Sequence, residues 1–311
     1  MRLSRRFWLP IVLILPSLRQ FPEILKAQAD LRFEVRAGKT RLTRSFAQSP
    51  LLVQRVLYLD DAIPHMASVF LLNPTPGLFQ GDEHHTRINA GPLTRAHVTT
   101  PSATKVHAMP NGRALQNVEL NLGKDSYLEY FPEPLIPFNN ARLTQRTRAN
   151  LSPKAVLVIG EVISPGRVAY GENFAFEYLD RRLTVIDPTG IPLFHESSVV
   201  SPKKLPPLRR PVLDAELPTT GTLVIIAQGF NIYELANQLF INLSLISRED
   251  DGFLIGLSDL FYESGLVIKV LAKNSTIAMT ILRNCARTAR TFFVNRMGQP
   301  EFDSINPKET G

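Results

Sequence analysis

Short apolar runs separated by turn residues constrain the fold of this chain more than any other feature of its sequence. From Asp30 onward, runs rich in Val, Leu, Ile, Thr and Phe recur at close spacing, and Gly, Pro and Asn separate them. Val118, Leu120 and Leu122 alternate with polar residues, whereas residues 155–159 (AVLVI) form a continuous apolar run. Runs of this length, with few helical patterns between them, are typical of β-strands. The sequence therefore predicts a mainly β protein.

Helical patterns occur in the last third of the chain. Apolar residues recur at three- and four-residue spacing within residues 231–248, and again from the N-cap residue Asn274 towards Arg296. Between these two predicted helices, residues 252–271 have the pattern of a β-hairpin. The single cysteine, Cys285, falls on the apolar face of the second helix, so we expect a buried thiol and no intramolecular disulfide.

Basic residues line two of the predicted elements. One is a strand that is polar on both faces, which we therefore place at the edge of a sheet; its residues are Arg142, Thr144, Arg146 and Arg148. The other is the second helix, whose basic face is either solvated or a docking surface for a protein partner; its residues are Arg283, Arg287 and Arg290.

The formal net charge of +7 lies in the N-terminal part of the chain. Residues 1–60 contain 11 Lys and Arg against 4 Asp and Glu, whereas the remaining 251 residues contain 24 of each sign. A nucleic-acid-binding protein needs a basic face on the folded domain itself. We therefore expect no nucleic-acid partner.

Residues 1–30 have the pattern of an N-terminal extension. Basic residues precede the apolar run FWLPIVLIL, and residues 27–29 (AQA) resemble a signal-peptide cleavage site. However, the apolar run contains Pro10 and is far too short to span a bilayer. We therefore favour a packed or disordered extension, or a start codon assigned too far upstream, over export, and we expect no membrane contact.

Asp82, Glu83, His84 and His85 form the densest cluster of candidate metal ligands. Carboxylate and imidazole groups suit Ni, Zn or Cu ions. Neighbouring side chains on a strand point to opposite faces, so His84 and His85 cannot readily share one ion there. The cluster is therefore either a weak metal site or an exposed polar turn.

A second concentrated phrase, GRVAYGE, spans residues 166–172. Its glycines allow tight backbone turns around Arg167 and Glu172, whose side chains we expect to pair. Glu161 lies just upstream on a predicted strand, from which its side chain can project into an interior channel. A carboxylate buried in this way needs a cationic partner, water or a metal ion.

Common catalytic motifs are absent from the sequence. It contains no GxxxxGKS/T, GxSxG or HExxH motif, which argues against a P-loop nucleotide hydrolase and against two common classes of hydrolase. Paired carboxylates for glycoside hydrolysis remain an open alternative, because their separation depends on the fold.

Several phrases, taken in order, resemble the urease accessory protein family UreD, also called UreH. The most characteristic is TTPSATK; the others are PLLVQR, LNPTPG followed by Gly-Asp, YLEYFP, IPF, and the glycine phrase GRVAYGE. The motif residues are Gly81, Thr100, Pro101, Lys105, Gly166, Arg167 and Gly171. The resemblance covers residues 31–297 and leaves residues 298–311 as a C-terminal tail.

The resemblance implies both a fold and a role. The fold would consist of helically stacked β-sheets, a β-solenoid-like arrangement, with helices added towards the C-terminus. The role would be that of a cytoplasmic, non-enzymatic chaperone or scaffold in the insertion of nickel into urease. Such a protein would bridge the urease apoprotein and UreF, the GTPase UreG would dock on UreF, and the complex could be dimeric. We expect no tightly bound cofactor, only transient Ni²⁺.

By the same resemblance, three carboxylates become candidates for lining or supporting the passage of nickel: Asp82, Glu161 and Glu172. The chain departs from the family pattern at two places. Residues 80–82 read Gln-Gly-Asp in place of Gly-Gly-Asp, and His84 and His85 replace hydrophobic or basic residues. The histidines either add a transient nickel-binding point or are local variation.

Two other functions are compatible with the sequence. A secreted, β-rich enzyme acting on polysaccharide would use the signal-like leader and a carboxylate pair, and cleavage after Ala29 would identify it. A standalone nickel- or zinc-binding protein would instead bind its metal tightly and stoichiometrically in isolation.

Overall fold

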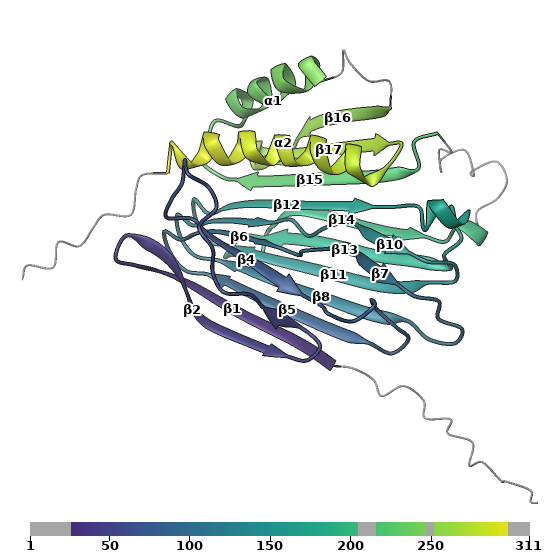
Figure 1. Cartoon of the computed structure of the whole chain (residues 1–311). Coiled ribbons are helices and arrows are strands. Elements are labelled where there is room, and N and C mark those ends of the chain that lie inside the picture. The colour runs from purple at the N-terminus through teal and green to yellow at the C-terminus, as the bar shows by residue number, and fades with distance from the viewer. Residues whose placement is uncertain (1–25, 205–215, 247–251, 298–311) are drawn as a thin grey trace, which may run out of the picture.

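The chain forms two stacked β-sheets with two helices covering one of them (Figure 1). The computed structural model describes residues 26–204, 216–246 and 252–297. In spatial order, the seven-stranded sheet contains β14 (Pro192–Val200), β13 (Tyr178–Ile186), β11 (Arg142–Leu151), β8 (Ala114–Leu122), β5 (Glu83–Ala90), β1 (Lys26–Arg36) and β2 (Lys39–Gln48).

The ten-stranded sheet carries the C-terminal hairpin at one edge. Its strands, in spatial order, are β16 (Phe253–Asp259), β17 (Gly265–Ala272), β15 (Thr219–Ala227), β12 (Val156–Ile163), β9 (Tyr127–Tyr130), β6 (Arg95–Thr99), β4 (Ala67–Leu72) and β3 (Leu52–Val53). Two short strands lie off this path, with β10 (Leu135–Pro137) paired to both β12 and β7 (Thr104–Val106). Short 3-10 turns occur at η1 (Val168–Tyr170), η2 (Pro202–Lys204) and η4 (Phe261–Glu263).

The chain winds between the two sheets as a stacked coil. Strands β5, β8, β11 and β13 add to the seven-stranded sheet in parallel, while β6, β9 and β12 add in parallel to the other sheet. Each turn of the coil therefore places one strand in each sheet. This arrangement confirms the prediction of a mainly β, solenoid-like fold, and antiparallel strands such as β14 and β15 complete the two sheets.

The continuous apolar run of β12 is explained by burial on both faces. Leu157 and Ile159 face the other sheet, where they join one hydrophobic cluster. Val156 and Val158 point the opposite way and join the cluster beneath the helices. Strands covered on both faces have continuous apolar sequences, because neither face meets water.

Helices α1 (Ile232–Ile246) and α2 (Ser275–Val294) lie on the outer face of the ten-stranded sheet, as Figure 1 shows. The Asn274 side chain caps α2 by accepting a hydrogen bond from the Ile277 backbone N–H. Cys285 is buried in the cluster between α2 and the sheet, and burial raises the pKa of its thiol to about 12. Both helices, the β16–β17 hairpin and the buried thiol confirm the predictions. Neither α1 nor α2 is apolar enough over sufficient length to cross a membrane, and the rest of the described chain contains no such helix.

The prediction that the arginine-rich strand forms a sheet edge is wrong. That strand is β11, and it lies between β8 and β13 in the seven-stranded sheet. Its arginines point to the outer face of this sheet, whereas Gln145 and Thr147 point between the sheets and line a cavity. A strand with a solvent-facing side and a polar cavity behind it carries polar residues on both faces, even at the centre of a sheet.

Strand β1 begins within the predicted extension of residues 1–30. Ala27 and Ala29 are fully buried, and residues from Lys26 onward pair with β5. Cleavage after Ala29 would remove the first four residues of this strand. Residues 26–30 of the predicted extension therefore belong to the folded domain.

Candidate functional site

A row of polar side chains crosses the core between the two sheets. The strand register aligns one inward-facing residue from each of five neighbouring strands of the seven-stranded sheet: His84, Gln116, Gln145, Arg181 and Ser198. The row next to it is apolar and consists of Ala114, Leu143, Leu179 and Val200. At about 4.8 Å per strand, the polar row extends for roughly 19 Å. We refer to these five residues as the polar row.

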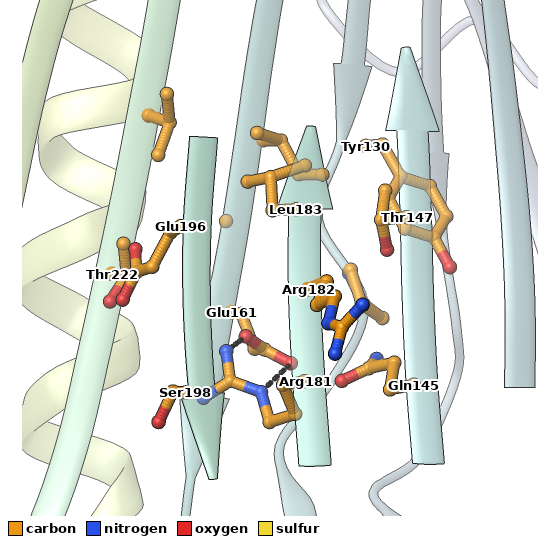
Figure 2. A pocket seen from close by; sticks show the side chains of 14 residues that line it. Tyr130, Gln145, Thr147, Glu161, Arg181, Arg182, Leu183, Glu196, Ser198 and Thr222 are labelled. Atoms are coloured by element: carbon orange, nitrogen blue, oxygen red, sulfur yellow. Dashed lines mark hydrogen bonds and ion pairs between the residues drawn. The ribbon is translucent and has the colours of Figure 1, made fainter. Parts of the chain in front are cut away.

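Glu161 faces the polar row from the opposite sheet. In Figure 2, its carboxylate meets the guanidinium of Arg181 in the space between the sheets. Arg181 Nε donates to Glu161 Oε1 over 3.2 Å, and Nη2 lies against the other carboxylate oxygen. Burial lowers the pKa of Arg181 to about 10, so the guanidinium remains charged at neutral pH. Glu161 is thus an interior carboxylate with one cationic partner.

Two adjoining cavities surround this ion pair. One of about 50 Å³ is lined by Glu161 and Tyr130, and the other, of about 240 Å³, reaches Lys269 on β17. Both are lined by Arg181, Glu196, Ser198 and Thr222. Glu196 accepts a hydrogen bond of 2.5 Å from Lys269 Nζ, which links the two sheets. Water and small ions can therefore occupy a polar interior at this end of the row.

The opposite end of the polar row opens into a cavity of about 90 Å³ beside the TPSATK phrase. Thr100, Pro101 and Lys105 line it together with His84. Tyr130 lines both this cavity and the one at Glu161, so its side chain stands between them. Burial raises the pKa of Tyr130 to about 12, which keeps its hydroxyl neutral. The cavities therefore follow the polar row from the TPSATK phrase to Glu196.

His84 and His85 point to opposite faces of β5, as the strand pattern predicts. His84 is 4% exposed, and its Nε2 atom is buried without a hydrogen-bond partner. His85 is exposed on the outer face of the sheet. The two imidazoles therefore do not converge. Within residues 26–204, 216–246 and 252–297, no group of three or more His, Cys, Asp and Glu side chains is arranged to hold a metal ion.

Acidification should destabilise the protein through His84. Burial, followed by the charge of His85, lowers the pKa of His84 from 6.5 to about 4. Between these two values the unfolded chain binds more protons than the folded one, so the free energy of unfolding falls as the pH falls from about 6.5 to 4. The loss approaches about 3 kcal/mol. In urea titrations across this range, His84→Leu should remove this component, whereas the control His195→Gln, an exposed position, should keep it.

Asp82 belongs to a turn rather than to the cavities. Its Oδ2 atom accepts a hydrogen bond of 2.8 Å from the Phe79 backbone N–H, and its own carbonyl accepts one from Leu115. Gly81, with a φ of 89°, provides the left-handed backbone of this turn. The side chain is 4% exposed. Asp82 therefore fixes the start of β5 and with it the position of His84.

Asp82→Ala should lower the free energy of unfolding by about 1 to 3 kcal/mol, because the Phe79 N–H loses the buried carboxylate that accepts its hydrogen bond. Asp82→Asn keeps an acceptor oxygen at that position and should recover most of the loss. Chemical denaturation of the three proteins measures the difference. Equal stability of Asp82→Ala and the parent protein would show that the turn does not depend on this side chain.

Gly166, Arg167, Gly171 and Glu172 form a closed loop after β12. Arg167 pairs with Glu172, as expected, and its guanidinium lies 4.2 Å from the centre of the Phe138 ring. Glu172 also accepts a hydrogen bond of 3.1 Å from the Asn139 backbone N–H. The hydrogen bond from Arg167 is the main cause that holds the pKa of Glu172 below its usual value. A side chain at Gly166 would collide with the Glu172 carbonyl, which explains that glycine.

The TPSATK residues bind the segment before β5 and the segment after β9. Thr100 Oγ1 accepts a hydrogen bond of 2.9 Å from the Glu133 N–H, and the Lys105 carbonyl accepts one of 2.8 Å from Leu78. Gly77 packs against the backbone of Lys105 so closely that an added Cβ would lie 2.3 Å from its carbonyl oxygen. These contacts shape the mouth of the cavity that contains His84.

Of the three candidate carboxylates, only Glu161 lies in the interior cavities described above. Sequence reasoning did not identify Gln116, Gln145, Arg181 or Glu196, which surround the same space. A signal was present for Gln116, because it has the same strand parity as Val118 and Leu120 and must therefore point inward.

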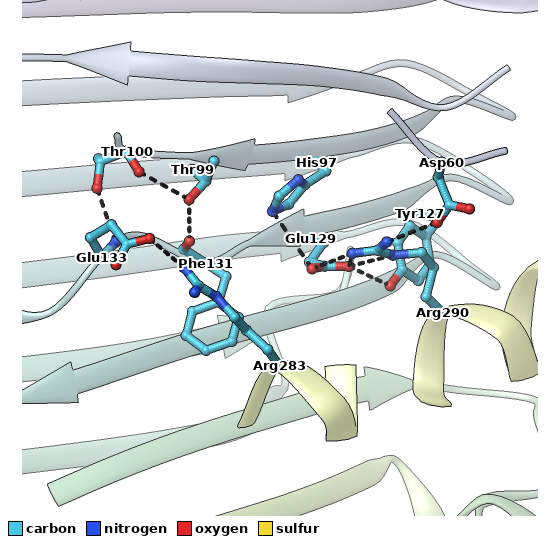
Figure 3. A network of polar contacts seen from close by, with 10 residues as sticks. All are labelled: Asp60, His97, Thr99, Thr100, Tyr127, Glu129, Phe131, Glu133, Arg283 and Arg290. Carbon is cyan, nitrogen blue, oxygen red and sulfur yellow. Dashed lines mark hydrogen bonds and ion pairs between the residues drawn. The ribbon is translucent and has the colours of Figure 1, made fainter. Parts of the chain in front are cut away.

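A second polar network lies beneath α2, on the other face of the ten-stranded sheet (Figure 3). Glu129, 2% exposed, accepts hydrogen bonds of 2.8 to 3.0 Å from Arg290 and one of 3.1 Å from the Tyr127 hydroxyl. Arg290 also donates to Asp60 over 2.9 Å, and His97 Nε2 lies 3.6 Å from Glu129. Burial alone would raise the pKa of Glu129, but the charges of His97 and Arg290 hold it below its usual value.

This network changes the interpretation of the basic helix face. Arg290 reaches inward to Glu129, and Arg283 pairs with Glu133. Only Arg287 of the three arginines has no ion pair within the part of the chain that the structure describes. Arg283 and Arg290 therefore hold the helix against the sheet.

Comparison with known proteins identifies the family. The family model described as UreD urease accessory protein matches residues 25–303. Urease accessory protein UreD 2 of Brucella canis is 32% identical over 262 residues, covering 84% of this chain and 85% of the relative. Urease accessory protein UreD of Cenarchaeum symbiosum is 30% identical over 264 residues, covering 85% and 91%. These relatives are named as accessory proteins rather than as enzymes, in agreement with the non-enzymatic role that the resemblance implies. Because the match spans most of the sequence, the chain belongs to the UreD urease accessory protein family.

Proposed function

We propose that this protein delivers nickel into urease in the cytoplasm, acting together with UreF and, through UreF, with UreG. Its membership of the UreD family supports an accessory role in urease maturation. The observation that supports nickel passage is the polar row with its flanking cavities, which places polar side chains along the space between the two sheets.

The chemistry of this interior suits transfer better than storage. Imidazole, amide, hydroxyl and carboxylate groups can each contact a divalent cation, and they are distributed along the row rather than gathered at one point. Glu161 offers a negative charge that is already paired with Arg181, so its attraction for a cation is reduced. A cation could therefore be attracted into the interior and still be released.

The structure offers no comparable support for the two other functions. A metal-storage protein needs converging ligands, and the described residues contain no such cluster. An exported enzyme processed after Ala29 would lose four residues from β1 that pair with β5. The pairing of these four residues with β5 therefore argues against cleavage after Ala29.

Co-expression of urease with and without this protein tests the proposal. We expect urease produced with UreF and UreG, but without this chain, to contain little nickel and to have low activity. Addition of the gene should restore the nickel content, measured by mass spectrometry on purified urease, and the activity. If urease acquires its nickel equally well without this protein, the proposal is wrong.

The order of assembly can be tested with purified proteins. The full chain should bind UreF directly and should retain UreG only when UreF is present. The urease apoprotein should bind the complex through this chain. Retention of UreG without UreF in size-exclusion chromatography would contradict the proposed arrangement.

A further inference from the structure

The outer face of the seven-stranded sheet carries a local excess of positive charge. Arg146 and Arg148 lie two residues apart on β11, and Arg182 lies directly opposite Arg146 on β13. Arg148 and Arg182 are both exposed. We refer to these three residues as the arginine triad. It lies on the solvent-facing side of β11 and β13, and Arg182 also borders the cavity at Glu161 (Figure 2).

The triad contains more cations than its surroundings neutralise. Asp180 binds Arg146 over 2.5 Å, but neither Arg148 nor Arg182 has a carboxylate within 4 Å in the described residues. By contrast, Arg87 on the same sheet face is paired with Glu119. Like charges directly opposite each other on neighbouring strands destabilise a sheet. A ligand that neutralised the triad would remove this repulsion.

A shallow groove of about 370 Å³ runs beside the triad. Its other lining residues include the hydrogen-bonding side chains of Gln28, His85 and Asn117. Glu119, which also lines the groove, is occupied by Arg87 and Asn121. The groove therefore offers guanidinium and amide donors, and its one carboxylate is already bound.

We propose that the arginine triad and its groove form a docking surface for an acidic, extended segment of a partner protein. Guanidinium groups bind carboxylates in a paired geometry that lysine cannot provide. Residues two apart on a strand are separated by about 6.7 Å, both in β11 and in an extended peptide. Carboxylates at alternate positions of such a peptide therefore match the spacing of Arg146 and Arg148. Arg148 and Arg182 are the two guanidinium groups available to bind them, because Asp180 already holds Arg146.

A protein partner fits this surface better than a nucleic acid does. Nucleic-acid binding requires a long basic stripe that follows the phosphate backbone. On β11 and β13 the positive charge of the triad spans only a short region, which is flanked by Asp180 and Glu119. Residues 61–311 carry equal numbers of basic and acidic side chains, and the basic excess of β1 and β2 lies at the far edge of the same sheet from β13.

Fluorescence anisotropy with a labelled peptide of alternating Glu and Ser tests this surface. The full chain should bind this peptide with an affinity that falls as salt is added, and should not bind the matching Gln-Ser peptide. The double variant Arg148→Glu/Arg182→Glu should weaken binding by at least about tenfold. The milder Arg148→Gln/Arg182→Gln should give an intermediate loss, and circular dichroism should show unchanged folding for both.

The control variant Lys273→Glu/Arg287→Glu removes the same charge from exposed positions elsewhere and should change binding by less than about twofold. An equal loss in this control would show that net charge, not the triad, holds the peptide. Failure of the parent protein to bind the Glu-Ser peptide would also overturn the proposal. Tighter binding of a single-stranded oligonucleotide, lost in the triad variants, would assign the surface to nucleic acid instead.

Discussion

Arg290→Met is expected to lower the free energy of unfolding by about 3 to 5 kcal/mol, because it leaves the Glu129 carboxylate buried without its main cationic partner. Glu129 is 2% exposed and receives three hydrogen bonds from Arg290, whereas the contact to His97 is longer, at 3.6 Å. Removing one partner of a buried ion pair lowers stability by more than the intact pair contributes. The remaining charge is then buried with neither water nor a partner to stabilise it.

A double-mutant cycle distinguishes this effect from simple loss of packing. Glu129→Gln/Arg290→Met removes both charges and should recover a large part of the stability lost in Arg290→Met alone. Arg287→Met, on an exposed position of the same helix, should change the free energy of unfolding by less than about 0.5 kcal/mol. Urea denaturation monitored by circular dichroism gives all of these values. A loss below about 1 kcal/mol in Arg290→Met would show that α2 does not depend on the buried pair.

The network also explains how α2 is oriented on the sheet. Arg290 forms ion pairs with Glu129 on β9 and with Asp60 in the segment before β4. Arg283 lies two helical turns earlier and forms an ion pair with Glu133. These contacts join segments far apart in the sequence (Figure 3). The helix therefore has a fixed rotation and register on the sheet, beyond what its apolar face alone would impose.

The local elements were predictable because each one has its own periodicity. Alternation identifies β8, a continuous apolar run identifies β12, and the Asn274 cap identifies the start of α2. The prediction that the sheets stack helically rested on the resemblance to a family, because periodicity alone does not show how sheets are arranged. Burial of Cys285 followed from its place on the apolar helix face.

The polar row was not predictable in the same way, because the coil brings together residues that are distant in the sequence. Gln116 and Gln145 are 29 residues apart, yet their amides are hydrogen-bonded over 3.3 Å on neighbouring strands. Strand parity places each of them inward, but only the register aligns them with Arg181. The incorrect edge assignment of β11 has the same origin. Its inward polar residues line a cavity whose existence depends on the opposite sheet.

Glu161→Gln is expected to reduce the activation of urease by at least about tenfold at limiting nickel, because it removes a negative charge from the interior route. An unpaired unit charge at about 4 Å contributes about 4 kcal/mol at an effective dielectric constant of 20. Arg181 offsets part of this attraction, but about 1.4 kcal/mol is enough for a tenfold change. The amide oxygen can still accept a hydrogen bond from Arg181, and the charge of nearby Glu196 still compensates the guanidinium, so the fold should be retained. Activity and nickel content of urease co-expressed with each variant measure the effect.

Glu172→Gln provides the matched comparison. It makes the same chemical change at a carboxylate that binds Arg167 in a surface loop and does not line the interior cavities. We therefore expect nearly normal urease activation from Glu172→Gln, and partial recovery of Glu161→Gln when nickel is supplied in excess. Normal activation by a folded Glu161→Gln protein at limiting nickel would exclude this carboxylate from the route. Equal defects in both variants would indicate instead that each carboxylate supports the structure of the complex.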